Sequence, residues 1–422
     1  MHILIIPPEE FVPINAPLSG IFQHDQAVAL NKTGNTIGVI SVTTSVALLP
    51  SLISLFRKIT TRKIYYKVLE GKSFLNIAIT IIRQLISGVT VEYTQLSGVN
   101  VLRIQCRCWN DSGAKGELSY FKHCIKRAAP LYKKKFGIPQ LIHAHNVWLA
   151  GLSAMELSVL WKVPFGITEH STFYARNLIP HSFYPELNRC YKASAFNLVV
   201  SLSLGELLKE QKLLSENYKY LPNMLDPLFE KKNPAFKNQT DSFVFLTIGE
   251  LTQKKAQDVL LRSFSKSFKE MNSVHLIIGG AGDMDSALKQ IVIDEGISSQ
   301  VTFTGQLDRK QVLEHMRNCN VFVLPSLYET FGVVLIEAMA MGKPVIATKS
   351  GGPETFVNSE NGLLISPGNE DELSNAMSMI YQKEKEYDTN AIRNDVLEHF
   401  GSEKIASSLT HIYTNAITSR NE

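Results

Sequence analysis

Short apolar segments recur along the chain at intervals that suit strands alternating with helices. Each is roughly four to eight residues long, rich in β-branched side chains, and followed by Gly, Pro or a polar cluster. This pattern is typical of buried parallel strands joined by crossover helices. The segments of the first half read HILII, TIGVISV, VNVLRI, LIHAH, FGITEH and FNLVVSL, and those of the second half read SFVFLTIG, VHLIIGG, VTFTG, VFVLPS and PVIATKSGG.

The pattern stops once, over residues 221–241, which are rich in Pro, Asn, Lys and Asp and therefore resemble a linker. A chain of 422 residues also exceeds one ordinary core. The sequence predicts two doubly wound, Rossmann-like α/β domains, over residues 1–223 and 224–402. Sheets of this kind bind ligands at the carboxyl ends of their strands, so the cleft between the domains is the expected site. A last helix is predicted after Ser402, its expected cap.

The segment SLYETFGVVLIEAMAM, residues 326–341, places two carboxylates around an apolar stretch. It predicts a helix capped by Thr330, whose unpaired amides at a strand's carboxyl end would bind an anion such as phosphate. Gly332 suits a close backbone approach. Glu329 and Glu337 flank this site, and carboxylates accept hydrogen bonds from hydroxyls. A nucleotide sugar, with a hydroxyl-bearing ring on each side of its phosphates, would satisfy both. A structural role for the two charges is the alternative.

Other residues with suitable chemistry follow the predicted strands. Lys254 and Lys255 come after the first strand of the second half, where a cation could meet a diphosphate. Gly280 belongs to a glycine-rich turn, Gly20 follows the first strand of the chain, and His170 ends another strand, although a single histidine there is often structural.

Composition narrows the function classes. The chain has five cysteines without CxxC spacing, which argues against a disulfide framework or a zinc site and suits a cytoplasmic location. The start MHILIIPPEEF reads as a strand and not as a signal peptide, and no run of about 18 apolar residues predicts a membrane span.

The net charge is +4, yet residues 51–135 carry 16 Lys and Arg against 4 Asp and Glu. This part of the chain is expected to meet an anionic partner.

The anionic partner that we expect is a membrane surface, not nucleic acid. Within residues 51–90, apolar positions at helical spacing lie beside Arg57, Lys58, Arg62 and Lys63, and aromatic residues follow. This combination suits a membrane interface. An ordinary amphipathic helix with a solvated basic face is the alternative.

The motifs together resemble the retaining glycosyltransferases of family 4, which have the GT-B fold. The resemblance rests on IGELTQKKAQD, LIIGGAGD, VTFTGQL, the segment from VLPSLYETFGVV to GGPETFV and NGLLI, and in the first half on Gly20, HAH, TEH and PN. It implies a nucleoside diphosphate sugar donor, a glycan or lipid-linked acceptor, no metal or other cofactor, and a C-terminal helix, residues 403–422, that packs back on the first domain. Envelope polysaccharide or lipopolysaccharide synthesis at the inner face of the cell membrane is the implied setting.

The resemblance also implies a role for each matching residue. Glu329 would contact the donor sugar, Lys255 would neutralise the diphosphate leaving group, and His170 would face the reacting carbon. Glu337 would hold the ribose hydroxyls. The other implied donor-binding positions are Gly20, Gly249, Lys254, Gly280, Phe303, Leu307, Thr330, Phe331, Gly332, Val333 and Val334.

The chain departs from the family pattern at Glu250, where an arginine is usual, so one of two phosphate cations is missing. Ala256 stands where a glycine is usual. Three alternatives remain open: a nucleotide-sugar epimerase, a phosphorylase, and a non-catalytic nucleotide-sugar-binding protein. A nicotinamide dehydrogenase is disfavoured, because no GxGxxG follows the first strand.

Overall fold

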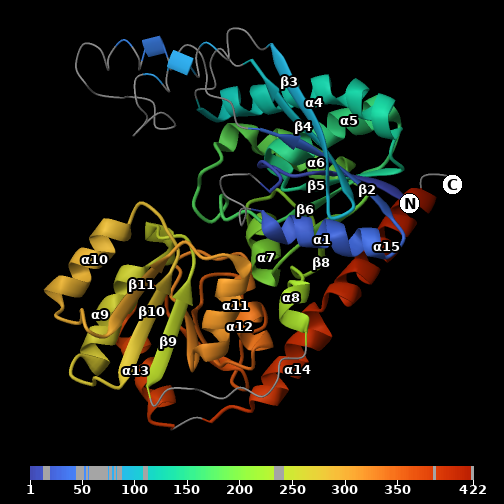
Figure 1. Cartoon of the computed structure of the whole chain (residues 1–422). Coiled ribbons are helices and arrows are strands. Elements are labelled where there is room, and N and C mark those ends of the chain that lie inside the picture. Colours follow the sequence, from blue (N-terminus) through green and yellow to red (C-terminus); the bar gives the residue numbers. More distant parts are fainter. Residues whose placement is uncertain are drawn as a thin grey trace.

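A computed structural model describes residues 1–12, 20–43, 52–53, 56, 75, 78–79, 82, 88–107, 113–231, 242–383 and 386–419. These residues form two α/β units, each built on one largely parallel sheet, which lie one above the other in Figure 1. The predicted fold class, two facing Rossmann-like domains, is confirmed. All eleven predicted strand segments contain a strand.

The first sheet has eight strands in the order β3-β4-β2-β1-β5-β6-β7-β8. All neighbouring pairs are parallel except β3 and β4. The strands are β1 (His2–Ile6), β2 (Thr36–Val42), β3 (Val89–Leu96), β4 (Val99–Cys106), β5 (Leu141–His145), β6 (Phe165–Glu169), β7 (Asn197–Val199) and β8 (Lys219–Tyr220).

The antiparallel hairpin of β3 and β4 was not predicted. Its two-residue turn consists of Ser97 and Gly98, with φ angles of +50° and +87°, the positive values that the right-handed twist of a tight hairpin requires. Strand β3 is mostly exposed at the edge of the sheet, so it lacks the continuous apolar run by which the buried strands were found.

The second sheet has six parallel strands in the order β11-β10-β9-β12-β13-β14. This order reverses between β9 and β12, and such a point is where open α/β sheets bind their ligands. The strands are β9 (Phe243–Ile248), β10 (Val274–Gly279), β11 (Val301–Gly305), β12 (Val321–Leu324), β13 (Val345–Thr348) and β14 (Gly362–Ile365).

Helices cover both faces of each sheet. On β1, Ile3 and Ile5 face a core shared with α1 and α15, while Leu4 and Ile6 face the core under α4 and α5, as the alternation of side chains along a strand requires. In the second unit α11 and α12 cover one face, and α9, α10 and α13 cover the other.

The helices are α1 (Ile21–Lys32), α4 (Gly113–Phe136), α5 (Leu152–Trp161), α6 (Tyr184–Ala193), α7 (Leu202–Glu210), α8 (Pro227–Glu230), α9 (Gln257–Phe268), α10 (Asp285–Asp294), α11 (Arg309–Asn318), α12 (Val333–Ala340), α13 (Glu370–Tyr381), α14 (Thr389–Phe400) and α15 (Ser402–Thr418). Short helical turns are η2 (Val147–Gly151), η3 (His181–Phe183), η4 (Gln253–Lys255) and η5 (Pro353–Thr355). Among the described residues no helix is long and apolar enough to cross a membrane.

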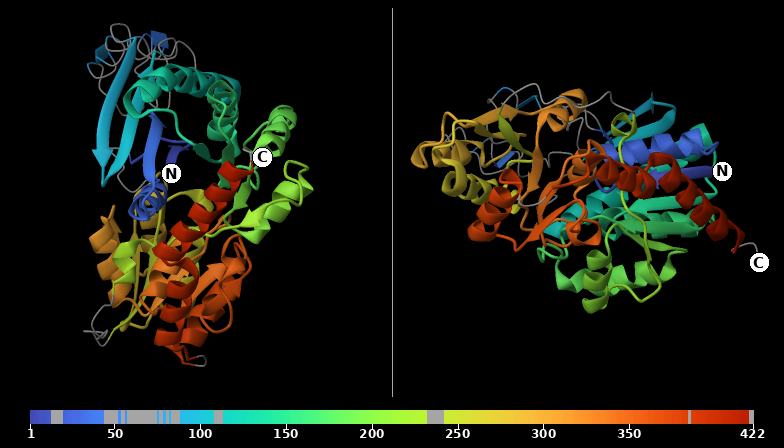
Figure 2. Two further views of the ribbon diagram at one scale, coloured as in Figure 1. Left: turned by 90° about the vertical axis from the view of Figure 1, so that its right-hand side faces the viewer. Right: turned by 90° about the horizontal axis from the view of Figure 1, so that it is seen from below.

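The two units are joined by more than the linker. The chain returns through α14 and α15, which run upward from the second unit to the first (Figures 1 and 2). Leu409 and Tyr413 of α15 are buried in the core of the first unit, and α14 contacts the linker through Arg393, whose guanidinium donates to the carbonyl oxygens of Phe229 and Glu230. Ser402 is the first residue of α15 and not its cap; Gly401 precedes it.

Candidate active site

The carboxyl-terminal edges of the two sheets meet at His170 and Thr330. His170 directly follows β6, and Thr330 lies in the loop between β12 and α12. The Thr330 hydroxyl donates to the His170 carbonyl oxygen over 2.7 Å. A small cavity of about 50 Å³ at this junction is lined from both units, by Ser171, Thr172 and Ser201 among others on one side and by Glu329 and Gly351 on the other. Residues predicted for the site thus lie at the junction of the two units.

The loop before α12 differs from the predicted cap. Helix α12 begins at Val333, preceded by Gly332 in a left-handed conformation with φ +88°, so Thr330 is not its cap. Thr330 instead uses its hydroxyl for the contact with His170. The Phe331 side chain is buried against Phe356 and Phe400, so only its backbone is placed to meet a ligand. Val333 and Val334 are half-buried.

Glu329 and Lys255 form an ion pair between two different loops. Their side-chain nitrogen and oxygen lie 2.5 Å apart, and the two side chains are 17% and 13% exposed for Lys255 and Glu329 respectively. The loop holding Glu329 is fixed by backbone bonds to the turn after β13, from Glu329 to Ser350 and from Gly352 to Glu329. The pair therefore places a cation and an acceptor side by side at the entrance to α12.

Lys254 points elsewhere. Its ammonium lies 3.5 Å from Glu250, in a more exposed ion pair, while Lys255 turns toward Glu329. Gly249 lies near Lys255, since a Cβ on Gly249 would be 3.9 Å from the Lys255 side chain. A Cβ on Gly280 would come within 1.8 Å of the Gly249 carbonyl oxygen. The two glycines let the ends of β9 and β10 approach each other closely.

Glu337 is buried in an ionic cluster that the sequence did not predict. One of its carboxylate oxygens accepts from Arg309 over 2.8 Å, while the other, Oε2, has no hydrogen-bond partner among the described residues. Arg309 also binds Asp226 of the linker and lies over the Phe229 ring, 5.1 Å from its centre. Burial raises the pKa of the Glu337 carboxyl above its usual range; Arg309 acts against this shift, and Asp226 and Asp25 add to it.

His170 is half-buried and stacks on the buried ring of His145. Its Nε2 is 2.9 Å from Nδ1 of His145, with the rings stacked at 5.0 Å, and Phe22 of α1 lies 5.0 Å away. Burial lowers the pKa of His145 to about 3 and that of His170 well below its usual value, with His145 adding to the second shift. Both imidazoles are therefore neutral at pH 7, and His170 can offer a neutral ring and a backbone carbonyl.

The remaining predicted residues border the same region. Gly20 precedes α1 with φ +65°, while the loop of residues 13–19 before it lies outside the described residues. Phe303 is in β11 and Leu307 just after it; a Cβ on Gly279 would come within 2.8 Å of the Leu307 side chain. Gly280 donates to the Gly305 carbonyl oxygen over 2.8 Å. The ends of β9, β10 and β11 thus form one continuous edge.

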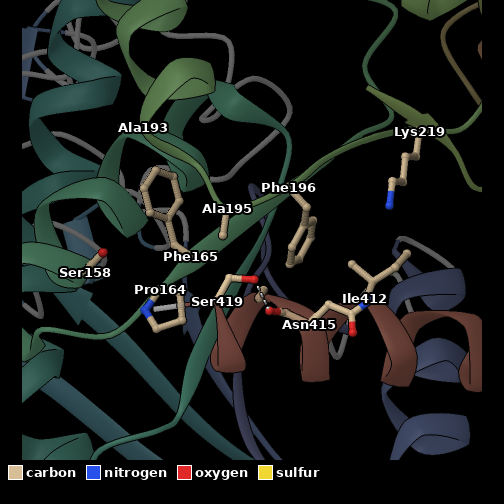
Figure 3. Close-up of a pocket in the computed structure, with 11 residues that line it drawn as sticks. Ser158, Pro164, Phe165, Ala193, Ala195, Phe196, Lys219, Ile412, Asn415 and Ser419 are labelled. Atoms are coloured by element: carbon tan, nitrogen blue, oxygen red, sulfur yellow. Dashed lines mark hydrogen bonds between the residues drawn. The ribbon is translucent and has the colours of Figure 1, made fainter. Parts of the chain in front are cut away.

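Two further observations bear on other kinds of site. Within the described ranges no group of three or more His, Cys, Asp or Glu could hold a metal ion. A cavity of about 460 Å³ lies at the opposite edge of the first sheet, between α15 and the starts of β6 and β7, where Figure 3 shows Phe165, Phe196 and Ile412 around it. None of the predicted site residues lines that cavity.

Sequence reasoning missed Arg309, Asp226, His145 and Glu169 as parts of the site. Glu169 is fully buried and accepts from the backbone of Val147, His170 and Ser171 and from Tyr191, so it fixes the loop that carries His170. Glu169 and His145 could have been found from the sequence, because each is a polar residue at the very end of a predicted strand. Nothing in the spacing of Arg309 and Asp226, 83 residues apart, indicated that they meet.

Comparisons with known proteins agree with this geometry. The model of the family Glycosyl transferases group 1 matches residues 229–395. An uncharacterized glycosyltransferase of Methanocaldococcus jannaschii is 25% identical over 77% of this chain and 87% of its own length. A D-inositol 3-phosphate glycosyltransferase of Paenarthrobacter aurescens is 26% identical over 66% of this chain and 73% of its own.

Solved structures are similar over nearly the whole chain. The sucrose-phosphate synthase of Thermosynechococcus elongatus has a TM-score of 0.74 at 18% identity and covers 99% of this chain and 100% of its own. HepE of Anabaena in complex with UDP has a TM-score of 0.68 at 17% identity, covering 98% of this chain and 100% of its own. At such identities the similarity concerns the fold.

Proposed function

This chain is a group 1 glycosyltransferase with the GT-B fold, and from that premise we propose that it moves a hexose-type sugar, with retention of configuration, from a nucleoside diphosphate sugar to a glycan or lipid-linked acceptor. The donor lies between the two units, with its nucleotide on the second. We assign the reaction to the synthesis of an envelope polysaccharide or lipopolysaccharide.

The observation that carries the donor assignment is the unpartnered oxygen of Glu337. Oε2 is buried and has no donor among the described residues. The other oxygen of the same carboxylate accepts from Arg309, whose positive charge offsets part of the cost of burying the negative charge. A buried acceptor without a partner costs roughly 1–3 kcal/mol, and a ribose hydroxyl would supply the missing donor. Glu337 lies on α12, behind the loop that carries Glu329. Ribose at Glu337 and a hexose at Glu329 place the diphosphate between them.

The chemistry assigned to the named residues follows from this placement. The bond between the anomeric carbon and the phosphate oxygen breaks, and Lys255 with nearby backbone amides stabilises the charge that the leaving diphosphate gains. Glu329 accepts from hydroxyls of the transferred sugar. The acceptor oxygen attacks from the face that the diphosphate leaves, and its proton passes to the departing phosphate oxygen. Neutral His170 faces the reacting carbon without adding a positive charge there.

The departure at position 250 alters the electrostatics of the phosphate site. Glu250 replaces the expected arginine and also pairs with Lys254, so Lys255 is the main side-chain cation assigned to the diphosphate. Because only one side-chain cation is assigned to the diphosphate, a nucleotide-sugar-binding protein without catalytic activity is the alternative that most needs a test.

Two measurements test the proposal. Unfolding followed by fluorescence with UDP, GDP and ADP should show stabilisation by one of them, of about 2.7 kcal/mol at 100 times its Kd. The matching nucleotide sugar should then release nucleotide only when an acceptor is present. Stabilisation without release would identify a binding protein. Isomerised nucleotide sugar without acceptor would identify an epimerase, and a requirement for inorganic phosphate would identify a phosphorylase.

We further propose that the enzyme binds the anionic inner face of the cell membrane through residues 51–90. Most of this segment lies outside the described residues. Its described apolar side chains include Leu52, Phe56, Leu75 and Ile82, which are 42%, 67%, 66% and 53% exposed. Exposed apolar groups beside basic ones suit a membrane interface.

The protein should therefore sediment with anionic liposomes at low salt and be released at high salt, because each Lys or Arg near such a surface contributes about 1 kcal/mol. Changing Arg57, Lys58, Arg62 and Lys63 to Ser should abolish the binding. The matched control changes four exposed lysines of the second half, Lys269, Lys310, Lys349 and Lys404, and should keep it. Liposome binding that survives the first set of changes, or none at low salt, would contradict the proposal.

A further inference from the structure

Two buried cysteines of the first unit lie against each other. Cys106 is the last residue of β4, and Cys124 lies on α4, which packs on that face of the sheet. Their thiols hydrogen-bond to each other, and the two side chains are 2% and 0% exposed respectively. A disulfide can form only between cysteines whose side chains already point toward each other, and this pair meets that requirement.

The side chain of Tyr120 ties the end of β4 to the part of α4 that carries Cys124. Tyr120 precedes Cys124 by about one helical turn, so the two side chains lie on the same face of α4. The Tyr120 hydroxyl accepts from the Cys106 amide over 3.3 Å and lies 3.4 Å from the Cys106 carbonyl oxygen, to which it can donate. Backbone contacts therefore hold the two cysteines in place relative to each other.

The two thiols differ in acidity. The hydrogen bond from Cys124 lowers the pKa of the Cys106 thiol, with burial acting against this shift and Arg127 adding to it. The same hydrogen bond, together with burial, raises the pKa of the Cys124 thiol. Cys106 is therefore the thiol that ionises first, and the thiolate is the nucleophilic form of cysteine. Cys124 keeps its proton and lies where it can react with a modified Cys106.

The other two described cysteines have different surroundings. Burial raises the pKa of Cys190 and that of Cys319 to about 12 each, and the groups that contribute to these two shifts include no second cysteine. The fifth cysteine, Cys108, lies outside the described residues. Among the cysteines that the structure describes, the acidic thiol and its neighbouring thiol are thus confined to Cys106 and Cys124.

The burial of the pair restricts the kind of oxidant that can reach it. A cavity of about 420 Å³ lies next to the pair, lined by Tyr120 and Phe121 of α4 and by Val42 at the end of β2, the neighbour of β4 in the sheet. Hydrogen peroxide is little larger than water, whereas a glutathione disulfide or a second protein is far bulkier. The surroundings of Cys106 therefore favour a hydroperoxide as oxidant.

We propose that Cys106 and Cys124 form a modification site, at which a hydroperoxide converts the two thiols into a reversible disulfide. The Cys106 thiolate attacks one peroxide oxygen, which breaks the O–O bond and leaves a sulfenic acid and hydroxide. The Cys124 sulfur then attacks the sulfenic sulfur, and the sulfenic oxygen leaves as water with the Cys124 proton. The hydroxide combines with the proton that Cys106 gave up. Two thiols and one hydrogen peroxide thus yield a disulfide and two waters, and the peroxide gains the two electrons that the sulfurs lose.

The disulfide would join β4 to α4 covalently. Such a cross-link stabilises a protein mainly by restricting the unfolded chain, so the oxidised protein should melt at a higher temperature. In a reducing compartment disulfides of this kind are transient and respond to oxidants, and a dithiol reductant reopens them by exchange. The inference does not rest on the proposed glycosyl transfer.

The test treats the full chain with hydrogen peroxide, blocks the remaining thiols with N-ethylmaleimide and digests the protein with trypsin. Cleavage after lysine and arginine places the three cysteines of this region on separate peptides, residues 104–107, 108–115 and 123–126. Mass spectrometry without reductant should find the first peptide linked to the third, about tenfold more than any other pair. The melting temperature should rise by a few degrees, and dithiothreitol should reverse both changes.

Cysteine variants separate this pair from the other thiols. Cys106→Ala and Cys124→Ala should each abolish the rise in melting temperature on oxidation. Cys108→Ala and Cys190→Ala are the matched controls, and both should keep the link and the rise. The peptide map of the wild-type protein does not depend on the folding of any variant. The inference is overturned if peroxide leaves both thiols free, if Cys106 links to Cys108 in preference, or if the rise in melting temperature persists in Cys124→Ala.

Discussion

Replacing Lys255 by alanine should lower kcat/KM by about 100- to 1000-fold, the range found when one preorganised donor to a developing oxyanion is removed. Lys255 is the cation that the loop after β9 turns into the site, held 2.5 Å from Glu329. With Glu250 in place of arginine, no second side-chain cation is assigned to the leaving diphosphate. The loss should fall on kcat more than on KM, because the diphosphate gains charge only as the bond breaks.

Lys254→Ala is the matched control, since it removes a neighbouring lysine that pairs with Glu250 outside the site. Its effect on kcat/KM should stay within about fivefold. Melting temperatures of both variants should be compared, because Lys255→Ala leaves Glu329 without its partner. Equal and small losses from the two changes would show that another group carries the phosphate charge.

The fold could be predicted because its strands are buried on both faces. The segments ILII, residues 3–6, and VFVL, residues 321–324, are apolar throughout, as is typical of strands in a parallel sheet that helices cover on both faces. Strands that are not buried on both faces were not predicted. Strand β3 lies at the exposed edge, and β8 is two residues long, so neither carries the pattern.

The positions of several candidate residues in the fold could be predicted from local features of the sequence. Gly332 and Gly280 are needed where backbones approach or take positive φ, and Glu329 and Lys255 stand in loops after strands. The start of α12 was misplaced because Thr330 suits a cap as well as the contact with His170 that it makes in the structure. Capping preference is local, whereas the contact joins residues 160 positions apart.

Contacts across the linker could not be predicted at all. Asp226 was assigned to a polar linker, yet it caps α8 by accepting from Leu228 and also binds Arg309. Arg309 in turn binds Glu337. The residue proposed to hold the ribose is thus connected by two ion pairs to the segment that joins the two units. Composition marks the linker as polar, but it does not say which charges are paired.

Replacing Glu337 by glutamine should raise the Kd of the nucleoside diphosphate sugar by about 10-fold or more, since a hydrogen bond to a charged acceptor contributes about 1.5–3 kcal/mol. The amide keeps the volume of the side chain, and Arg309 keeps its pair with Asp226, so the fold should survive; the melting temperature checks this. Glu329→Gln is the matched control. It should lower turnover without weakening the binding of the nucleoside diphosphate alone, because Glu329 is assigned to the sugar and not to the ribose; Glu337→Gln should weaken the binding of this ligand too.

The pH dependence of binding gives a second, independent signature of Glu337. Burial raises the pKa of this carboxyl above its usual range, and the ribose hydroxyls need the ionised form. As pH falls through that raised pKa, the carboxyl takes up a proton and the Kd of the wild-type protein should rise, by up to tenfold per pH unit below it. A nucleotide sugar is the right ligand, because its diphosphate has no group that titrates in this range. The Glu337→Gln variant should bind weakly and without this acid limb. If variant and wild type weaken in parallel as pH falls, the titrating group lies elsewhere and Glu337 does not hold the ribose.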